Sequence, residues 1–136
     1  MAFTTTSSAM AEDKNDFDYV VDRFADIEVL RYPVPDFDKL SLSQKMLVYH
    51  LTEAALAGRD ILWDQNCRLN LELRDMLEKI YTGYQGDRND PQFKAFEKYL
   101  KQVWFANGVH HHYSMDKFTP EFSRKWIMSQ LVRMPD

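Results

Sequence analysis

The sequence predicts an all-α fold of about five amphipathic helices joined by short turns. Apolar residues recur at steps of three and four along most of the chain, which is the spacing of one face of a helix. Helix-start signals precede several of these runs, and no run alternates between apolar and polar residues as a half-buried strand does. A chain of 136 residues, 45% of them hydrophobic, is long enough for one domain with one core.

The chain is expected to begin with a tail and a first helix. Residues 1–14 are small and polar without periodicity, so we expect them to be disordered, and the helical domain then spans residues 15–136. The first helix is predicted by apolar residues at helical spacing, namely Phe17, Val20, Val21, Phe24, Ile27 and Leu30. Pro33 and Pro35 end this helix, because proline disfavours helical backbone in the residue before it. Residues 31–40 are expected to form an extended connector.

Two further helices are expected in the middle of the chain. Ser41 and Gln44 have the spacing of a capping box, in which each side chain binds a free backbone N–H at the start of a helix. The helix that follows reaches Leu62. Gly58 offers a break within it, while the alanines around that glycine favour a close helix crossing. The next helix is predicted over residues 67–84.

The last two helices are predicted to start at X-Pro pairs. Asp90 is placed to cap a helix whose first residue is Pro91, and Asn107–Gly108 ends it. Thr119–Pro120 is predicted to start the last helix in the same way. That helix is rich in aromatic residues and little chain follows it, so we expect this chain to be a piece of a longer protein.

Composition and charge exclude several classes of partner. The net charge is -4 and the basic residues are spread along the chain, so neither nucleic acid nor a membrane surface is an expected partner. No run approaches the ~20 apolar residues of a membrane span. The N-terminus lacks the basic start and apolar segment of an intact signal peptide, which leaves both a cytoplasmic and an exported location open.

Outside the histidines, few side chains are candidates for catalysis or for binding a metal. The single cysteine, Cys67, excludes an internal disulfide and a Cys-rich zinc site, and its neighbours match no nucleophile motif, so it is interpreted as a structural thiol. Asp60 and Asp64 lie one helical turn apart, a spacing that suits acid–base work, but surface ion pairs are the favoured interpretation. We predict no catalytic residue, no metal ligand and no cofactor for this chain.

The run His110–His112 is the most conspicuous polar cluster. Adjacent histidines do not share a helix face, so three in a row rarely complete one metal site. The favoured interpretation of the run is a polar loop after the helix end. A loop that contacts a ligand is the next alternative, and a metal site is the least favoured. His50 is the only other histidine, and the sequence contains no His-Glu-x-x-His pair.

Three stretches resemble a known family. They are FADIEVLRYPVPDF from Phe24, AALAGRDILWDQN from Ala54 and VWFANGVHHHYSMDKFTP from Val103. Together they resemble the N-terminal part of the dipeptidyl peptidase III family of zinc metallopeptidases, in its bacterial (Bacteroides-like) form. The resemblance covers about residues 17–136 and rests on three long matches in the right order.

The resemblance implies a function for the parent enzyme. Members are two-lobed exopeptidases that remove dipeptides from the N-terminus of short peptides. Their zinc is held by the two histidines of a His-Glu-x-x-x-His-type motif and by a later glutamate. The metal polarises the scissile carbonyl and makes its bound water more acidic, and the motif's own glutamate activates that water. That motif is missing here, because in the family it lies far downstream in the other lobe. The resemblance therefore implies an inactive N-terminal fragment, whose partners are the remainder of the parent peptidase and a peptide substrate.

The resemblance also points to site residues. In the family, the loop that corresponds to residues 107–117 lies along the peptide-binding cleft, so Asn107, His112 and Tyr113 are expected to line a substrate subsite. Animal members differ in this loop and lack the triple histidine.

An alternative function is a stand-alone helical module that binds another protein. The aromatic last helix motivates this alternative, because exposed apolar patches often mark partner surfaces. Two further alternatives for an isolated fragment are a homodimer and an exchange of helices between copies, each of which would cover apolar surface.

Overall fold

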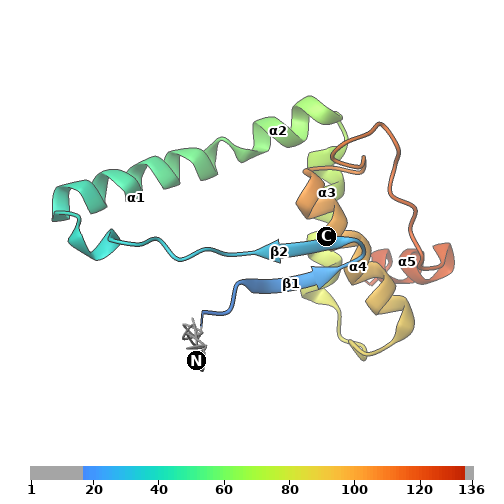
Figure 1. Cartoon of the computed structure of the whole chain (residues 1–136). Helices are drawn as coiled ribbons and strands as arrows, with labels where there is room; N and C mark the ends of the chain where they lie inside the picture. The colour runs from blue at the N-terminus through green and yellow to red at the C-terminus, as the bar shows by residue number, and fades with distance from the viewer. Residues whose placement is uncertain (1–16, 134–136) are drawn as a thin grey trace, which may run out of the picture.

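The computed structural model describes residues 17–133 and is mostly helical, with one small antiparallel hairpin (Figure 1). The tail predicted over residues 1–14 lies outside the described residues. The elements, in chain order, are β1 (Val20–Phe24), β2 (Ile27–Leu30), the 3-10 helix η1 (Phe37–Lys39), α1 (Leu42–Ala57), α2 (Arg59–Asn66), α3 (Asn70–Gly83), α4 (Pro91–Ala106) and α5 (Arg124–Leu131).

The core lies between α3 and α4, and α5 and the end of α2 pack against it. The sequence predicts a buried stripe on α4 made of Phe93, Phe96, Leu100, Val103 and Trp104. The first four are buried and Trp104 is half-buried, while Tyr99 and Ala106 are buried as well. The predicted cap is confirmed. The Asp90 side chain accepts the N–H groups of Gln92, at 2.8 Å, and Phe93, at 3.3 Å. No helix in the described part of the chain is long and apolar enough to cross a membrane.

The prediction of a helix over residues 15–30 is wrong, because residues 20–30 form the β1–β2 hairpin. Phe24 pairs with Ile27 across a tight turn in which Ala25 has a φ of 50°. Burial alternates residue by residue along both strands, so one face is covered and the other is wet. In so short a segment, apolar positions such as Val20, Phe24 and Ile27 fit both the helical period of about 3.6 residues and the strand period of two. Valine and isoleucine then favour strands.

The hairpin is held to α4 by an ion pair and by ring contacts. The Nζ of Lys101 lies 2.7 Å from Oδ2 of Asp22, and the Phe24 ring meets the Phe105 ring edge to face at 6.5 Å. The Lys101 ammonium donates a hydrogen bond to the Asp22 carboxylate and holds its pKa below the ordinary value, while the carboxylate raises the pKa of Lys101. The ion pair and the aromatic contact therefore hold the hairpin against α4.

Acid should release the hairpin from α4. Because the pKa of Asp22 is lowered in the folded state, the ion pair is complete above the ordinary aspartate pKa of about 3.9 and is lost as the pH falls through the lowered value. Asp22→Asn should remove it at neutral pH, and amide hydrogen exchange in β1 and β2 should then be faster while α4 is unchanged. The control is Asp26→Asn in the exposed turn. Equal exchange in the wild type and in Asp22→Asn would contradict this account.

The helix predicted from Ser41 to Leu62 divides into α1 and α2 at Gly58. The capping box is confirmed, since Ser41 N–H donates to Gln44 Oε1 at 2.9 Å and Gln44 N–H donates to Ser41 Oγ at 3.4 Å. The predicted close crossing is not found among the described residues. A Cβ added to Gly58 would approach only carbonyl oxygens of α1, at 3.6 and 3.8 Å.

The last helix begins later than predicted. Thr119–Pro120 does not start it, because α5 begins at Arg124 and its N-cap is Ser123, whose Oγ accepts the N–H of Trp126 at 3.2 Å. The preceding segment is tied to α4 in extended form. Gln92 Oε1 accepts the N–H of Ser123 at 2.8 Å, and Lys98 pairs with Glu121 at 2.6 Å. These tertiary contacts take the place of an early helix turn.

Candidate functional site

The candidate site is the loop Asn107–Lys117, which starts where α4 ends. Asn107 has the left-handed backbone conformation, with φ 54° and ψ 40°, and the N–H of Gly108 donates to the Val103 carbonyl at 3.0 Å. This is a common way to end a helix, because asparagine and glycine tolerate positive φ and the next N–H groups satisfy free carbonyls. The predicted helix end at Asn107–Gly108 is confirmed.

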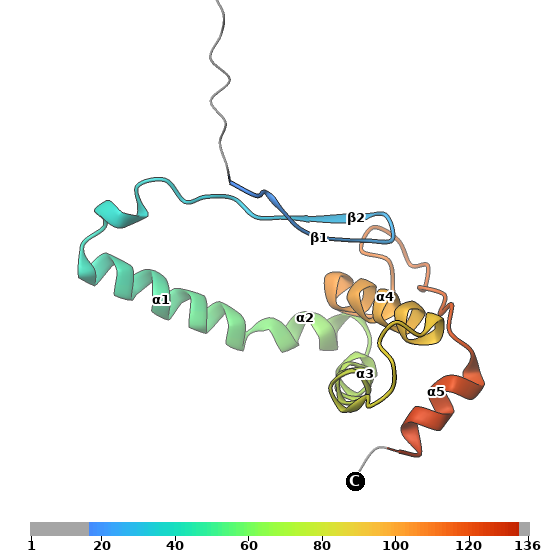
Figure 2. The same ribbon diagram turned by 90° about the horizontal axis from the view of Figure 1, so that it is seen from below.

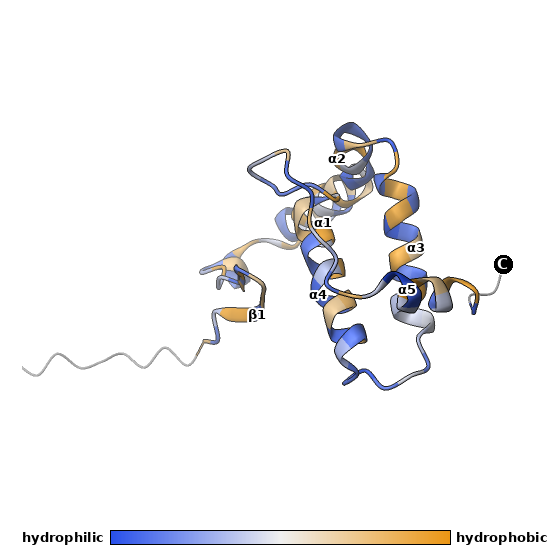
Figure 3. Cartoon of the chain, turned by 90° about the vertical axis from the view of Figure 1, so that its right-hand side faces the viewer, coloured by the Kyte–Doolittle hydropathy of each residue, from blue (hydrophilic) through white to orange (hydrophobic). Residues whose placement is uncertain are grey.

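The loop is closed at its base by backbone hydrogen bonds. His110 pairs with Lys117 as an antiparallel bridge, and the N–H of His111 donates to the Asp116 carbonyl at 2.8 Å. The N–H of Phe118 donates to the Val109 carbonyl at 2.9 Å. Figure 3 shows the loop as a mostly hydrophilic segment that projects beside α2. The histidine run therefore sits at one edge of a closed turn and not in an unstructured segment.

Aromatic rings stack along this edge. His112 lies between three neighbours: it meets Phe105 edge to face at 5.0 Å, stacks on His111 at 4.3 Å and lies 4.1 Å from Tyr113. The Nδ1 of His111 accepts the N–H of Tyr113 at 3.2 Å, which ties the His111 ring to the backbone of the loop. The Tyr113 side chain is 88% exposed and ends the stack in solvent.

The loop encloses a pocket of about 580 Å³ together with the ends of α2 and α4. All three residues predicted from the resemblance, Asn107, His112 and Tyr113, line it. Asn66 and Phe105 also line it, and sequence reasoning missed them. Asn66 is the last residue of the second matched stretch, and Phe105 lies within the third. Their positions in these stretches were the one feature of the sequence that could have pointed to them.

Between residues 17 and 133, no three histidine, cysteine, aspartate or glutamate side chains are grouped so that they could hold a metal ion. His50 lies on α1 and contacts Tyr49 at 5.3 Å, so it belongs to a different part of the molecule from the loop.

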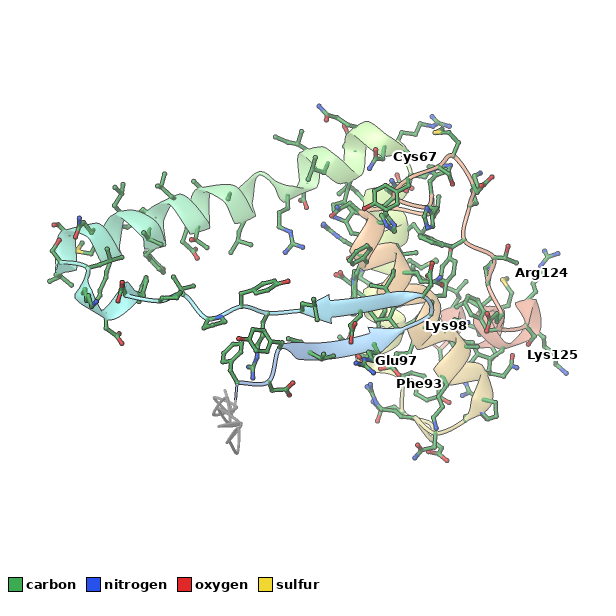
Figure 4. The ribbon with its side chains drawn as sticks, in the orientation of Figure 1. Cys67, Phe93, Glu97, Lys98, Arg124 and Lys125 are labelled. Atoms are coloured by element: carbon green, nitrogen blue, oxygen red, sulfur yellow. The ribbon has the colours of Figure 1, made fainter. Side chains whose placement is uncertain are left out.

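Asp60, one of the other polar candidates, has a structural partner. Asp60 pairs with Arg74 at 2.6 Å, and the Arg74 guanidinium also lies 5.1 Å from the centre of the Trp63 ring. The hydrogen bond from Arg74 holds the pKa of Asp60 below its ordinary value, which keeps the carboxylate ionised. Asp60 therefore forms an ion pair, as favoured from the sequence. Cys67 is half-buried at the corner between α2 and α3 (Figure 4).

No model of a known protein family matches this chain, and no curated protein matches it.

Proposed function

We propose that this chain is the N-terminal helical part of a zinc-dependent dipeptidyl peptidase that releases N-terminal dipeptides from short peptides. By itself the chain is inactive, because its sequence has no His-Glu motif for the zinc. The remainder of the parent peptidase supplies the metal, its ligands and the catalytic glutamate. The three matched stretches support this assignment, and no step of the reaction is assigned to a metal on this chain.

One structural observation carries the proposal: helix α1 is an apolar arm without a core of its own. It projects from the body formed by α3, α4 and α5 (Figures 1 and 2). Every residue of α1 is exposed except Lys45, which is half-buried. Its exposed large apolar side chains are Leu42, Met46, Leu47, Val48, Tyr49, Leu51 and Leu56.

These side chains are distributed around the helix and do not form a single stripe. A surface helix of a complete domain has one apolar face, whereas a helix that is apolar on all sides is normally buried in a larger protein. Exposed apolar surface of this extent marks a site of association. The exposed apolar surface of the α1 arm is therefore evidence for a partner that covers it on more than one side. We propose that this partner is the remainder of the parent peptidase.

The pocket formed by the loop suits a peptide. Tyr113 offers an exposed aromatic face on which a substrate side chain can pack. The imidazole of His112 and the amide of Asn107 offer donors and acceptors for a peptide backbone. The rings of Phe105, which meets His112 edge to face, and of His111, which stacks on it, limit the positions open to His112, so less conformational freedom is lost when a peptide binds.

Replacing Tyr113 with alanine should weaken substrate binding. In the product of the complete reading frame that contains this chain, we expect the KM for an arylamide dipeptide to rise about 3- to 10-fold, the value of one aromatic contact, with kcat nearly unchanged. Steady-state kinetics with zinc would measure both constants.

A matched control is Val132→Ala, since Val132 is 84% exposed and lies beyond α5, away from the loop. That variant should keep the wild-type KM. An unchanged KM in Tyr113→Ala would remove the loop from the substrate cleft.

A second candidate function is a stand-alone helical interaction module, and the exposed α1 arm also favours it. In this case the arm is covered by another protein or by a second copy of the chain. A homodimer predicts sedimentation coefficients that rise with concentration, whereas a monomer at all concentrations contradicts self-association. A reading frame that continues past Asp136 to a His-Glu motif would favour the peptidase instead.

A further inference from the structure

We infer that Asn70 is a positioning residue for the loop Asn107–Lys117, and that its side-chain amide fixes the direction in which the chain leaves α4. The inference rests on the proposed function in one respect, namely that this loop lines a peptide cleft. The fixed direction itself is argued from contacts within the chain.

Asn70 joins three helices from a buried position. It is the first residue of α3, and it is 1% exposed. Its Nδ2 donates to the carbonyl of Trp63, in the last turn of α2, at 3.1 Å and to the carbonyl of Asn107, at the end of α4, at 3.4 Å. A carboxamide has two N–H donors, so each carbonyl can take one of them. Asn70 thus connects the α2–α3 corner to the foot of the loop.

Gly108 completes the contact from the side of the loop. Its φ is +153°, and a Cβ built on it would lie 2.3 Å from Nδ2 and 2.9 Å from Cγ of Asn70. Only glycine lets the backbone approach the buried amide so closely. His110 and the ring stack follow directly, so a change in the backbone here moves the pocket wall.

The amide is not explained by packing alone. Its Oδ1 has no hydrogen-bond partner within residues 17–133, and a buried polar atom without a partner carries a desolvation cost. An apolar side chain of similar volume would avoid that cost. The two N–H donors give a defined distance and direction between Trp63 and Asn107, which an apolar side chain cannot provide.

The test compares the loop in two variants of the full 136-residue chain. Asn70→Leu keeps the volume and removes both donors, and Ile80→Val lowers core packing in α3 away from the loop. We expect Asn70→Leu to shift the NMR signals of His110–His112 and to speed hydrogen exchange at Gly108 and Phe118 at least tenfold. The signals of His50 on α1 serve as an internal reference and should stay in place.

Ile80→Val should leave the loop signals unchanged after correction for any loss of global stability. If the leucine variant does not fold, the same measurements are made on Asn70→Ser, because the serine side chain is too short to reach both carbonyls. Wild-type loop signals in a folded Asn70 variant, or equal effects of Asn70→Leu and Ile80→Val, would overturn the positioning role.

Kinetics of the complete reading-frame product separate this inference from the proposed function. A displaced loop with a raised KM, an unchanged zinc content and little change in kcat supports both. A displaced loop with an unchanged KM supports the role of Asn70 and contradicts the assignment of the cleft. A loop that does not move contradicts the role of Asn70 whatever the KM.

Discussion

Replacing Phe96 with alanine is expected to lower the free energy of unfolding by about 3–5 kcal/mol, because it empties the centre of the core. Phe96 is 0% exposed, and its ring lies 5.7 Å from that of Phe122 and 5.4 Å from that of Trp126. It is therefore the main aromatic link between α4 and the segment that leads into α5. Urea unfolding followed by tryptophan fluorescence and by circular dichroism would measure the loss.

The control for this variant is Phe105→Ala on the same helix. Phe105 is 44% exposed, and the rings in contact with it are Phe24 of the hairpin and His112 of the loop, so its removal should cost much less. If both substitutions cost the same, or if Phe96→Ala costs less than about 1 kcal/mol, the core is not centred where α4 meets α5.

The second large effect is expected on the α1 arm, and it should appear only in the complete protein. Leu47 and Leu51 lie one helical turn apart and are 59% and 60% exposed. Replacing both with glutamate should change the stability of the isolated chain by no more than about 0.5 kcal/mol, because the new charges remain in water. If the proposed parent peptidase covers the arm, the same charges are buried without partners in the complete reading-frame product, which costs several kcal/mol and should abolish folded, active enzyme.

Val21→Glu is the matched control, because Val21 on β1 is also 59% exposed and lies off the arm. Thermal unfolding of the chain and the yield of soluble complete product would be measured for both variants. Normal yield and activity of the product with Leu47→Glu and Leu51→Glu would show that nothing in the parent protein covers this arm.

The sequence predicted the local signals of helices well. The capping box at Ser41, the Asp90–Pro91 start and the Asn107 end are set by residues within one helical turn, and each is present in the structure. The stripe of α4 was also predictable, since a helix of sixteen residues has room for its period to be recognised.

The errors lie where distant contacts decide the local structure. The β1–β2 hairpin is too short for its apolar spacing to distinguish a helix from a strand, and its docking depends on Lys101, which lies 79 residues from Asp22. The start of α5 is delayed by bonds from α4 to Ser123 and Glu121. No local pattern in the sequence encodes either contact.

The candidate site was predicted only in part. Resemblance pointed to Asn107, His112 and Tyr113, and the structure places all three around one pocket. The closed base of the loop and the buried amide of Asn70 depend on how three helix ends meet. Asn70 looks like an ordinary polar residue at a helix start, so nothing in the sequence marked it.

We propose that this chain is the non-catalytic start of a dipeptidyl peptidase. The most direct test is the rate of dipeptide release from an arylamide substrate with zinc, measured for the chain and for the product of its complete reading frame. We predict that the complete product releases dipeptides and that the chain alone does not. Turnover by the chain alone at a comparable rate, or no release by the complete product, would contradict the account.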